Sequence, residues 1–317
     1  MSKLFIIGNG FDSAHKMPTS YEEFRKYIIG EYELSEHEDE IPEIPDSSLM
    51  PDGEEFIDPK EAMRLAVWLL SWCGGSEDCE WKEFESNLAS LDYESVMDEN
   101  TAFCDDPEHP FWEANNYEMI ASNLQSAMQM LPQIFEKWVE TIPISKNKIS
   151  DIVDLFNDSC YVLTFNYTET LEVLYGIPEE NVCHIHGKRG GRQCLLVGHG
   201  VERPRQFQVH IGADHILQEI DMQLKKDTIG ALKKNNLFFQ KLASENITEI
   251  YSYGFSFSDV DMIYIKKICS DVDTDNVIWY LNDFGLDDTK KSQIEEKIYQ
   301  AGFRGTFGVP YHIHTTN

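Results

Sequence analysis

Segments typical of strands and segments typical of helices alternate along the chain from Ile149 to the C-terminal end. Short apolar runs that end at glycine or polar residues predict strands at residues 3–7, 161–164, 181–185, 195–197, 249–253 and 277–281, with a last extended piece beyond 299. Helical periodicity predicts helices at 151–156, 168–175, 213–242, 259–269 and 291–299. This alternation favours an α/β protein with a Rossmann-like, mainly parallel sheet.

A second region, between the first strand and the later ones, has helical patterns only. Ser20-Tyr21-Glu22-Glu23 matches a capping box, and helices are expected at 21–29, 61–72, 81–91 and 111–140. The tryptophans of this region fit helical packing: Trp68, Trp72, Trp81, Trp112 and Trp138. We therefore expect a Rossmann-like nucleotide-binding domain of residues 1–30 and 148–317, with an acidic loop and helical insertion at 31–147.

The formal charge of the chain is −30, from 26 basic and 56 acidic residues. Phosphate backbones are bound by clustered Lys and Arg, so this charge argues against a nucleic-acid partner. Residues 31–55 hold eleven Glu or Asp and no Lys or Arg. Such a run is expected to be a solvated loop, and the alternative is a docking surface for a basic protein partner.

The expected location is the cytoplasm, with no membrane partner. No apolar run approaches the roughly 18 residues of a membrane span, and the apolar residues 4–7 are too few for the core of a signal peptide. The seven cysteines are scattered without a Cys-x-x-Cys pair, so reduced thiols are expected.

Glycine and polar residues follow the first predicted strand as Gly8-Asn9-Gly10-Phe11-Asp12. Ligands of open parallel sheets bind beyond the carboxyl ends of the strands, and glycines let backbone N–H groups approach a phosphate. Asp12 can accept hydrogen bonds from ribose hydroxyls. The third glycine of the dinucleotide fingerprint is absent, so an ordinary tight turn stays an alternative.

Two further polar groups follow later strands. Asn166, between Thr164 and Thr168, can hold a water or a sugar hydroxyl, or serve only as a turn residue. In His184-Ile185-His186-Gly187 the two histidines share a strand face, which is compatible with a metal site, but no third ligand is evident. A single working histidine, His186, beside the close-approach glycine Gly187 fits a general base better.

Glycine and serine residues also follow the strand at 249–253. Gly254 and Ser256 can offer N–H and hydroxyl groups to a phosphate or ribose, or simply begin a capped helix. Asn282 closes the next strand, where it can meet an adenine or ribose edge or form a plain turn. Polar and glycine residues thus stand at the ends of at least four strands.

In order along the chain, these motifs resemble those of the AbiH family of bacterial proteins linked to abortive infection by phage. The resemblance rests on Gly8-Asn9-Gly10-Phe11-Asp12 with His15, on Thr19-Ser20-Tyr21 with Phe24, on Phe165-Asn166-Tyr167-Thr168 and on His184-Ile185-His186-Gly187. Two residues depart from the family pattern. Ser13 stands where Leu is usual, and Phe255 stands where His is usual, so a histidine in that second loop is not essential here.

The chain also resembles, more remotely, the sirtuin-like NAD-binding fold. Thr164-Phe165-Asn166-Tyr167-Thr168 precedes His186-Gly187 by an interval close to that of the sirtuins. This resemblance implies that Asn166 and His186 face the nicotinamide ribose. The zinc cysteines are absent and Thr168 replaces an aspartate, so NAD cleavage survives these differences better than protein deacylation does.

The leading hypothesis is an abortive-infection effector that cleaves NAD at its nicotinamide N-glycosidic bond, with Asn166, His186 and Asp12 as catalytic residues. NAD is then substrate or ligand, and no permanently bound cofactor is expected. Residues expected to bind the nucleotide are Gly8, Asn9, Gly10, Phe11, His15, Thr164, Thr168, Gly187, Gly254, Ser256 and Asn282. A nucleotide-sensing module without catalysis and a metal-dependent nuclease or phosphohydrolase are the alternatives. A protein trigger of phage or host origin and homo-oligomers are compatible with each.

Overall fold

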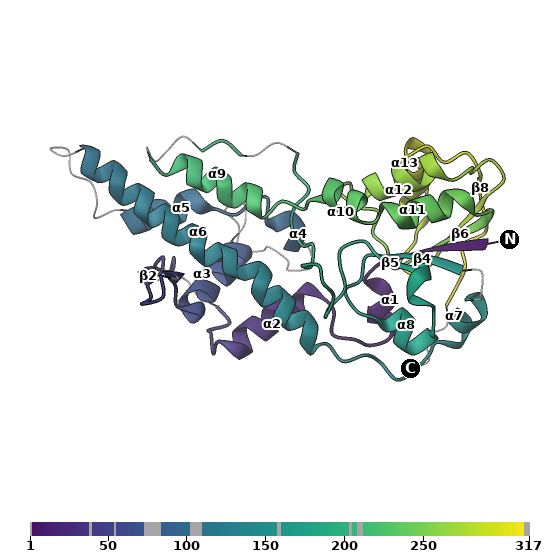
Figure 1. Cartoon of the computed structure of the whole chain (residues 1–317), viewed down its shortest axis with the longest axis horizontal. Coiled ribbons are helices and arrows are strands. Elements are labelled where there is room, and N and C mark those ends of the chain that lie inside the picture. The colour runs from purple at the N-terminus through teal and green to yellow at the C-terminus, as the bar shows by residue number, and fades with distance from the viewer. Residues whose placement is uncertain are drawn as a thin grey trace. The chain divides into compact units, whose positions relative to one another are not determined.

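The computed structural model describes residues 2–37, 40–53, 55–72, 84–101, 110–156, 160–202, 205–207 and 212–313 (Figure 1). The chain divides into two compact units. The sheet unit comprises Met1–Thr19, Val139–Leu196 and Asp227–Asn317, and the helical unit comprises Ser20–Trp138 and Val197–Lys226.

The sheet unit contains a six-stranded sheet in which every neighbouring pair of strands is parallel. Its strands, in spatial order, are β5 (Val182–His184), β4 (Cys160–Thr164), β1 (Ser2–Ile7), β6 (Ile247–Tyr253), β7 (Ile278–Leu281) and β8 (Thr306–Phe307). The chain adds β4 and β5 on one side of β1 and then β6, β7 and β8 on the other. This is the 3-2-1-4-5-6 order of doubly wound nucleotide-binding sheets, in which the switch point lies beside the first strand. The predicted mainly parallel α/β class is confirmed.

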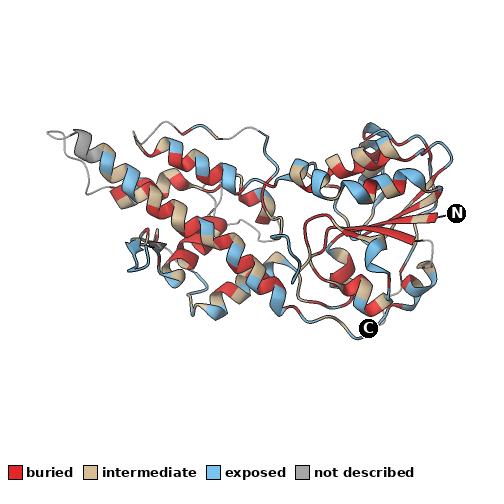
Figure 2. Cartoon of the chain, in the orientation of Figure 1, coloured by how far each residue is buried: buried red, intermediate tan, exposed pale blue. Residues whose placement is uncertain are grey.

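Alternation along β1 explains why both faces of the sheet are covered. Leu4 and Ile6 pack into one apolar cluster, and Phe5 and Ile7 pack into another. Helices α10 (Thr228–Lys234), α11 (Asn236–Ser244), α12 (Met262–Asp271) and α13 (Asp288–Gln300) contribute to the first cluster. Helices α1 (Gly10–Ala14), α7 (Ser150–Leu155) and α8 (Thr170–Tyr175) contribute to the second. The central strands are accordingly buried on both sides (Figure 2).

One expectation for this part of the chain is wrong, and a second is refined. Residues 195–197 form no strand: Leu196 makes a backbone hydrogen bond to His186 (2.8 Å), and the chain then passes to the helical unit. The long helical stretch expected over 213–242 consists of three helices, α9 (Asp214–Gln223), α10 and α11. The first break occurs because Lys226 pairs its backbone N–H with His199 and the Asp227 side chain caps α10 by accepting from Gly230 N–H.

The described part of the helical unit holds α9 and five further helices. These are α2 (Tyr21–Glu31), α3 (Pro59–Ser71), α4 (Phe84–Asn87), α5 (Tyr93–Thr101) and α6 (Pro110–Thr141), the last of which runs on into the sheet unit. The capping box at the start of α2 is confirmed, since the Ser20 side chain accepts from Glu23 N–H. Of the helix expected at 81–91, residues 81–83 lie outside the described residues.

Aromatic side chains form the core of the helical unit. The Phe24 ring lies 5.1 to 5.7 Å from the rings of Phe84, Phe135 and Trp138. Trp68 and Trp138 are buried, as expected for packing residues, whereas the side chains of Trp81 and Trp112 lie outside the described residues. Because Phe24 packs here, α2 belongs to the helical unit. Residues 197–226, which include α9, also belong to it. The expected division at residues 30 and 148 therefore differs from the observed units.

The acidic segment is largely solvated, and its described Glu and Asp residues from 31 to 52 are exposed. It is nevertheless held at several points. Ile44 is buried and its N–H donates to the Asn100 side chain (2.8 Å). Two short antiparallel strands, β2 (Ser48–Leu49) and β3 (Glu55–Phe56), were not expected from the sequence.

Candidate functional site

The carboxyl ends of the central strands lie level with one another. Ile7 of β1 is in register with Thr164 of β4 and Tyr253 of β6, and Thr164 is in register with His184 of β5. Polar residues that follow these strands are therefore brought to one edge of the sheet. We call five of them the strand-end cluster: Asp12, Asn166, Thr168, His186 and Asp261. Each is between 1% and 6% exposed.

Asp12 carries a buried carboxyl group whose pKa is raised. Thr168 Oγ1 donates a hydrogen bond of 2.5 Å to Asp12 Oδ2. Oδ1 is buried and accepts no hydrogen bond of normal geometry from the described residues. Burial raises the pKa of Asp12 to about 6, although the side chains of Thr168, Thr170 and Asn166 and the charge of His184 act in the opposite direction. Asp12 can therefore change its charge close to neutral pH.

Asn166 is positioned through its backbone. Its N–H donates to Thr164 Oγ1 (3.1 Å), and its carbonyl oxygen accepts from His184 Nδ1 (2.9 Å). The side-chain Oδ1 is buried and has no hydrogen-bond partner among the described residues. Since a buried amide oxygen without a partner costs free energy, it marks a place where a ligand hydroxyl or a water would be stabilised.

His184 holds the backbone of Asn166 in place through a hydrogen bond to its carbonyl oxygen. Because a carbonyl oxygen only accepts, the Nδ1 that faces Asn166 carries a proton, while Nε2 lies 2.9 Å from Glu172 Oε1. Burial raises the pKa of Glu172, but the hydrogen bond and charge of His184, with the charge of Lys188, outweigh it and lower the pKa overall. Both ring nitrogens of His184 are thus engaged, and no group of three or more His, Cys, Asp or Glu in the described ranges is arranged to hold a metal ion.

His186 points into the cluster from the end of β5. Its Nε2 lies 3.4 Å from Asp261 Oδ1, and Asp261 Oδ2 accepts from Ser258 Oγ (3.0 Å). The rings of Phe165 and Tyr264 meet the imidazole edge to face, at 5.1 and 5.6 Å. A histidine held between aromatic rings with a carboxylate beside one nitrogen has the arrangement of a base and its orienting partner.

The glycines after β1 serve a contact between two turns. Gly8 and Gly10 donate their N–H groups to the carbonyl oxygens of Tyr253 and Gly254 (3.0 and 3.1 Å). A Cβ on Gly8 would lie 2.4 Å from Gly254 O, and a Cβ on Gly10 would lie 2.6 Å from Gly254 Cα. Gly254 itself has φ +63°, a conformation that favours glycine. In this structure the glycines let the β1 and β6 turns touch, and the Gly10 N–H takes part in this contact.

Several residues expected to bind nucleotide have packing roles. Phe11 is 1% exposed and meets the Tyr253 ring edge to face. His15 is held by Phe11 O and the Tyr175 hydroxyl, each at 2.7 Å, and burial lowers its pKa. Asn9 donates to Thr19 O (2.9 Å), which closes the turn. Gly187 has φ +88° and lies against Cys194 and Leu195.

A cavity of about 690 Å³ lies beyond the carboxyl ends of β6 and β7, and we call it the β6–β7 cavity. Gly10, Gly254, Ser256 and Asn282 line it, together with apolar residues that include Phe255, Leu286 and Ile294. The Asn282 side chain also closes its own turn, because it donates to Tyr311 O and accepts from Phe284 N–H (both 3.2 Å). Four of the predicted residues therefore line the cavity, four belong to the strand-end cluster, and the others lie in neither group.

Two residues that shape the cluster, Asp261 and Glu172, were not predicted as site residues, and His184 was considered only as a metal ligand. Asp261, Glu172 and His184 orient the predicted ones through the contacts above. The available signal was weak: Asp261 directly precedes a helix, where an aspartate is ordinarily a cap. No spacing rule connects it with His186.

A family model described as bacteriophage abortive infection AbiH matches residues 4–283. The match begins in β1 and extends past Asn282, so it includes all of the strand-end cluster. It confirms the resemblance found in the motifs. No curated protein and no solved structure matches the chain. Among the described residues no helix is long and apolar enough to cross a membrane.

Proposed function

We propose that this chain, which belongs to the AbiH family of bacteriophage abortive infection proteins, binds NAD in its sheet unit and cleaves the bond between nicotinamide and ribose. The family assigns the protein to phage abortive infection, and loss of NAD would starve an infected cell. The resemblance to the sirtuin-like fold, carried by Asn166 and His186, suggests NAD as the nucleotide.

The observation that carries the proposal is the strand-end cluster beside the switch point of the sheet. Asp12, Asn166 and His186 come from the ends of three neighbouring strands, and each has a support: Thr168 for Asp12, His184 for Asn166 and Asp261 for His186. Groups of this kind held in one place fit a reaction that depends on positioning and charge. The adjoining β6–β7 cavity has a volume typical of small-ligand sites.

Cleavage of NAD needs few groups. The C1′–N bond breaks with both electrons going to nicotinamide, which leaves as a neutral base, so no general acid is required. The ribose carbon passes through an oxocarbenium-like state and takes the oxygen of a water. In the proposed mechanism Asn166 Oδ1 holds the water or the ribose. His186 accepts the proton of the attacking water, and Asp261 orients the His186 ring. Ionised Asp12 stabilises the positive charge of the ribose. The products are ADP-ribose, nicotinamide and a proton.

The test is incubation of the purified protein with NAD, NADP, ATP and GTP, followed by mass spectrometry of the products. Release of nicotinamide and ADP-ribose from NAD, absent in a folded His186→Gln variant, is the expected result. The same measurement is made in phage-infected cells that express the protein. If wild-type protein releases no nicotinamide either when purified or in these cells, the enzymatic proposal fails.

A nucleotide sensor is the second candidate, and burial favours it. Asp12, Asn166 and His186 are at most 6% exposed and none of them lines the β6–β7 cavity. A sensor would bind nucleotide and return it intact. A calorimetric titration that detects binding, with unchanged nucleotide recovered afterwards, would favour the sensor over the enzyme. The metal-dependent nuclease has no comparable support in the described part of the chain.

A further inference from the structure

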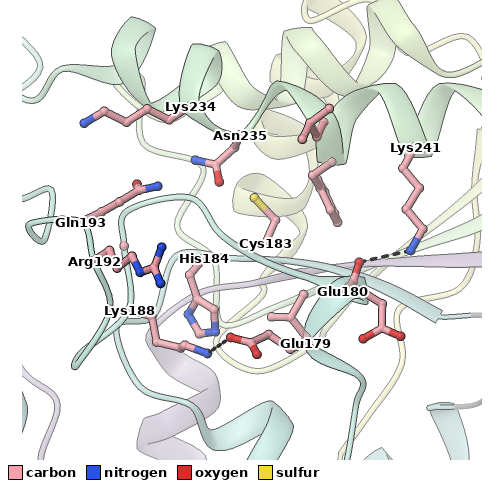
Figure 3. Close-up of a pocket in the computed structure, with 15 residues that line it drawn as sticks. Glu179, Glu180, Cys183, His184, Lys188, Arg192, Gln193, Lys234, Asn235 and Lys241 are labelled. Atoms are coloured by element: carbon pink, nitrogen blue, oxygen red, sulfur yellow. Dashed lines mark hydrogen bonds and ion pairs between the residues drawn. The ribbon is translucent and has the colours of Figure 1, made fainter.

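A second pocket lies at the β5 edge of the sheet, and we call it the β5-edge pocket (Figure 3). Its volume is about 510 Å³, and its walls come from β5, from the loop of residues 187–193 and from α10 and α11. Strands β4, β1 and β6 separate β5 from β7, so this pocket is distinct from the β6–β7 cavity. Both pockets belong to the sheet unit.

Positive charge gathers in this pocket against the trend of the chain. Lys188, Arg192, Lys234 and Lys241 line it, opposed by Glu179 and Glu180. The whole chain has 26 basic and 56 acidic residues, so this excess of basic over acidic groups runs against the charge of the chain as a whole. A concave site in which positive charge exceeds negative charge attracts anionic ligands.

Two of the four basic side chains are already occupied. Lys188 Nζ pairs with Glu179 (2.7 Å) and Glu172 (3.2 Å), and Lys241 Nζ donates to Glu180 O (3.1 Å) and Asn181 Oδ1 (2.9 Å). Arg192 and Lys234, by contrast, make no hydrogen bond or ion pair with any residue that the structure describes. Figure 3 shows them toward one end of the pocket, with Gln193 between them. Their charges are available to an anion.

The remaining wall of the pocket is apolar. Leu237, Phe238 and Val182 line it, and Leu237 is 80% exposed although it stands on a helix of the sheet unit. An exposed leucine beside a phenylalanine is a surface on which a flat ring would bury apolar area. The pocket thus combines an anion-binding end with a ring-binding wall.

We propose that the β5-edge pocket binds a nucleoside phosphate, with the phosphates between Arg192 and Lys234 and the base against Leu237 and Phe238. Guanidinium and ammonium groups are the usual partners of phosphate in proteins. This site is additional to the NAD site and does not depend on catalysis there.

The experiment is calorimetric titration of the full chain with ATP in the presence of EDTA. The test variant is Arg192→Gln/Lys234→Gln, and the matched control is Lys146→Gln/Lys148→Gln, which removes the same charge from exposed positions of the sheet unit outside the pocket. Loss of two charge-assisted contacts is expected to weaken ATP binding at this site about tenfold or more, while the control binds as wild type.

A second variant tests the contact between the nucleobase and the apolar wall of the pocket. Leu237→Ser should weaken binding of ATP but leave binding of inorganic tripolyphosphate unchanged. Thermal melts within a few degrees of wild type show that each variant is folded. Absence of ATP binding to wild type, or equal binding by the Arg192/Lys234 variant and its control, overturns the proposal; equal ATP binding by Leu237→Ser overturns the assignment of the base. None of these outcomes depends on whether the protein cleaves NAD.

Discussion

The strand-end cluster and the β6–β7 cavity both include residues of α1, Asp12 in the cluster and Gly10 in the cavity, but they differ in what they contain. The cluster has two buried carboxylates, an amide and a histidine, each with a supporting contact, and its members are at most 6% exposed. The cavity has room for a small ligand, at about 690 Å³, and its walls are largely aromatic and aliphatic. The cluster thus has groups capable of catalysis, and the cavity has the space for a ligand.

This difference means that nucleotide binding and nucleotide turnover can be tested separately, although the strand-end motifs assigned both to the same residues. Binding of the nucleotide should depend on the cavity, and turnover should depend on the cluster. Substitutions that change one property and spare the other therefore test whether the two regions form one site.

The largest effect is expected for His186→Gln. Glutamine keeps a hydrogen-bonding end but takes no proton near neutrality, and a general base is typically worth about a hundredfold or more in rate. Nicotinamide release should fall by that factor while NAD affinity changes little. Asp261→Asn, which alters only the orienting partner, should lie between this variant and wild type. Undiminished turnover by folded His186→Gln would remove this histidine from the reaction.

A pH-dependent change in stability is expected next, from Asp12. The pKa of Asp12 is raised from 3.8 to about 6 by burial, so between these values the folded state binds more protons than the unfolded state. Stability contributed by protonated Asp12 is therefore present below pH 3.8 and lost as pH rises through 6. The shift of roughly 2 pKa units corresponds to a loss of up to about 3 kcal/mol.

Asp12→Asn removes this titration. Urea unfolding of wild type and variant at about pH 4 and about pH 7 should show the variant gaining relative stability at the higher pH. A difference in unfolding free energy that is the same at both pH values would contradict the raised pKa. If ionised Asp12 also stabilises the ribose cation, turnover of wild type should fall as pH drops below 6.

Gly10→Ala should destabilise the fold by about 1–3 kcal/mol, because its Cβ would lie 2.6 Å from Gly254 Cα and the two turns would have to separate. The matched control is Gly30→Ala in α2, where a Cβ would meet nothing within 4 Å and alanine favours the helix. Urea unfolding of both variants measures the contrast. A normal free energy of unfolding for Gly10→Ala, with weakened NAD binding, would restore this glycine to a phosphate-binding role.

The smallest effect is expected at the rim of the cavity. Phe284 is 91% exposed and lines the β6–β7 cavity, so Phe284→Ser should leave stability unchanged and weaken NAD binding about threefold to tenfold. Titration in the His186→Gln background keeps NAD intact during the measurement. Val309→Ser, at a position 84% exposed and outside the cavity, is the control. Equal NAD affinity of the two variants would place the nucleotide elsewhere.

Local patterns predicted most elements of the sheet unit but failed where a segment depended on its neighbours. Within the predicted strand at 3–7, residues 4–7 are apolar on both alternate faces. The segment is therefore recognisable as a buried strand, and β1 confirms it. The run at 195–197 is equally apolar, but it forms no strand, and its Leu196 N–H donates to the carbonyl oxygen of His186. The stretch 213–242 has helical periodicity throughout, but the bonds of His199 to Lys226 and of Asp227 to Gly230 interrupt it.

The same limit applies to the candidate site. Asp12, Asn166 and His186 were recognisable because each follows an apolar run, a position that parallel sheets use for ligands. Asp261 was not, because its contact with His186 joins residues from the two sides of β1 in the strand order. Likewise, nothing local distinguishes a glycine that admits a phosphate from one that admits a neighbouring turn, as Gly8 and Gly10 do.

The amino-acid sequence by itself determined the family, the α/β class and the strand ends at which polar residues stand, since motifs, apolar runs and turn residues are properties of short segments. Only the tertiary structure decided the strand order, the partner of each polar side chain and the separation of a polar cluster from an apolar cavity. The physical reason is that hydrogen bonds, burial and the raised pKa of Asp12 depend on atoms within a few ångströms. In this fold such atoms come from separate parts of the chain, and Asp12 and Thr168, which share a hydrogen bond, are 156 positions apart.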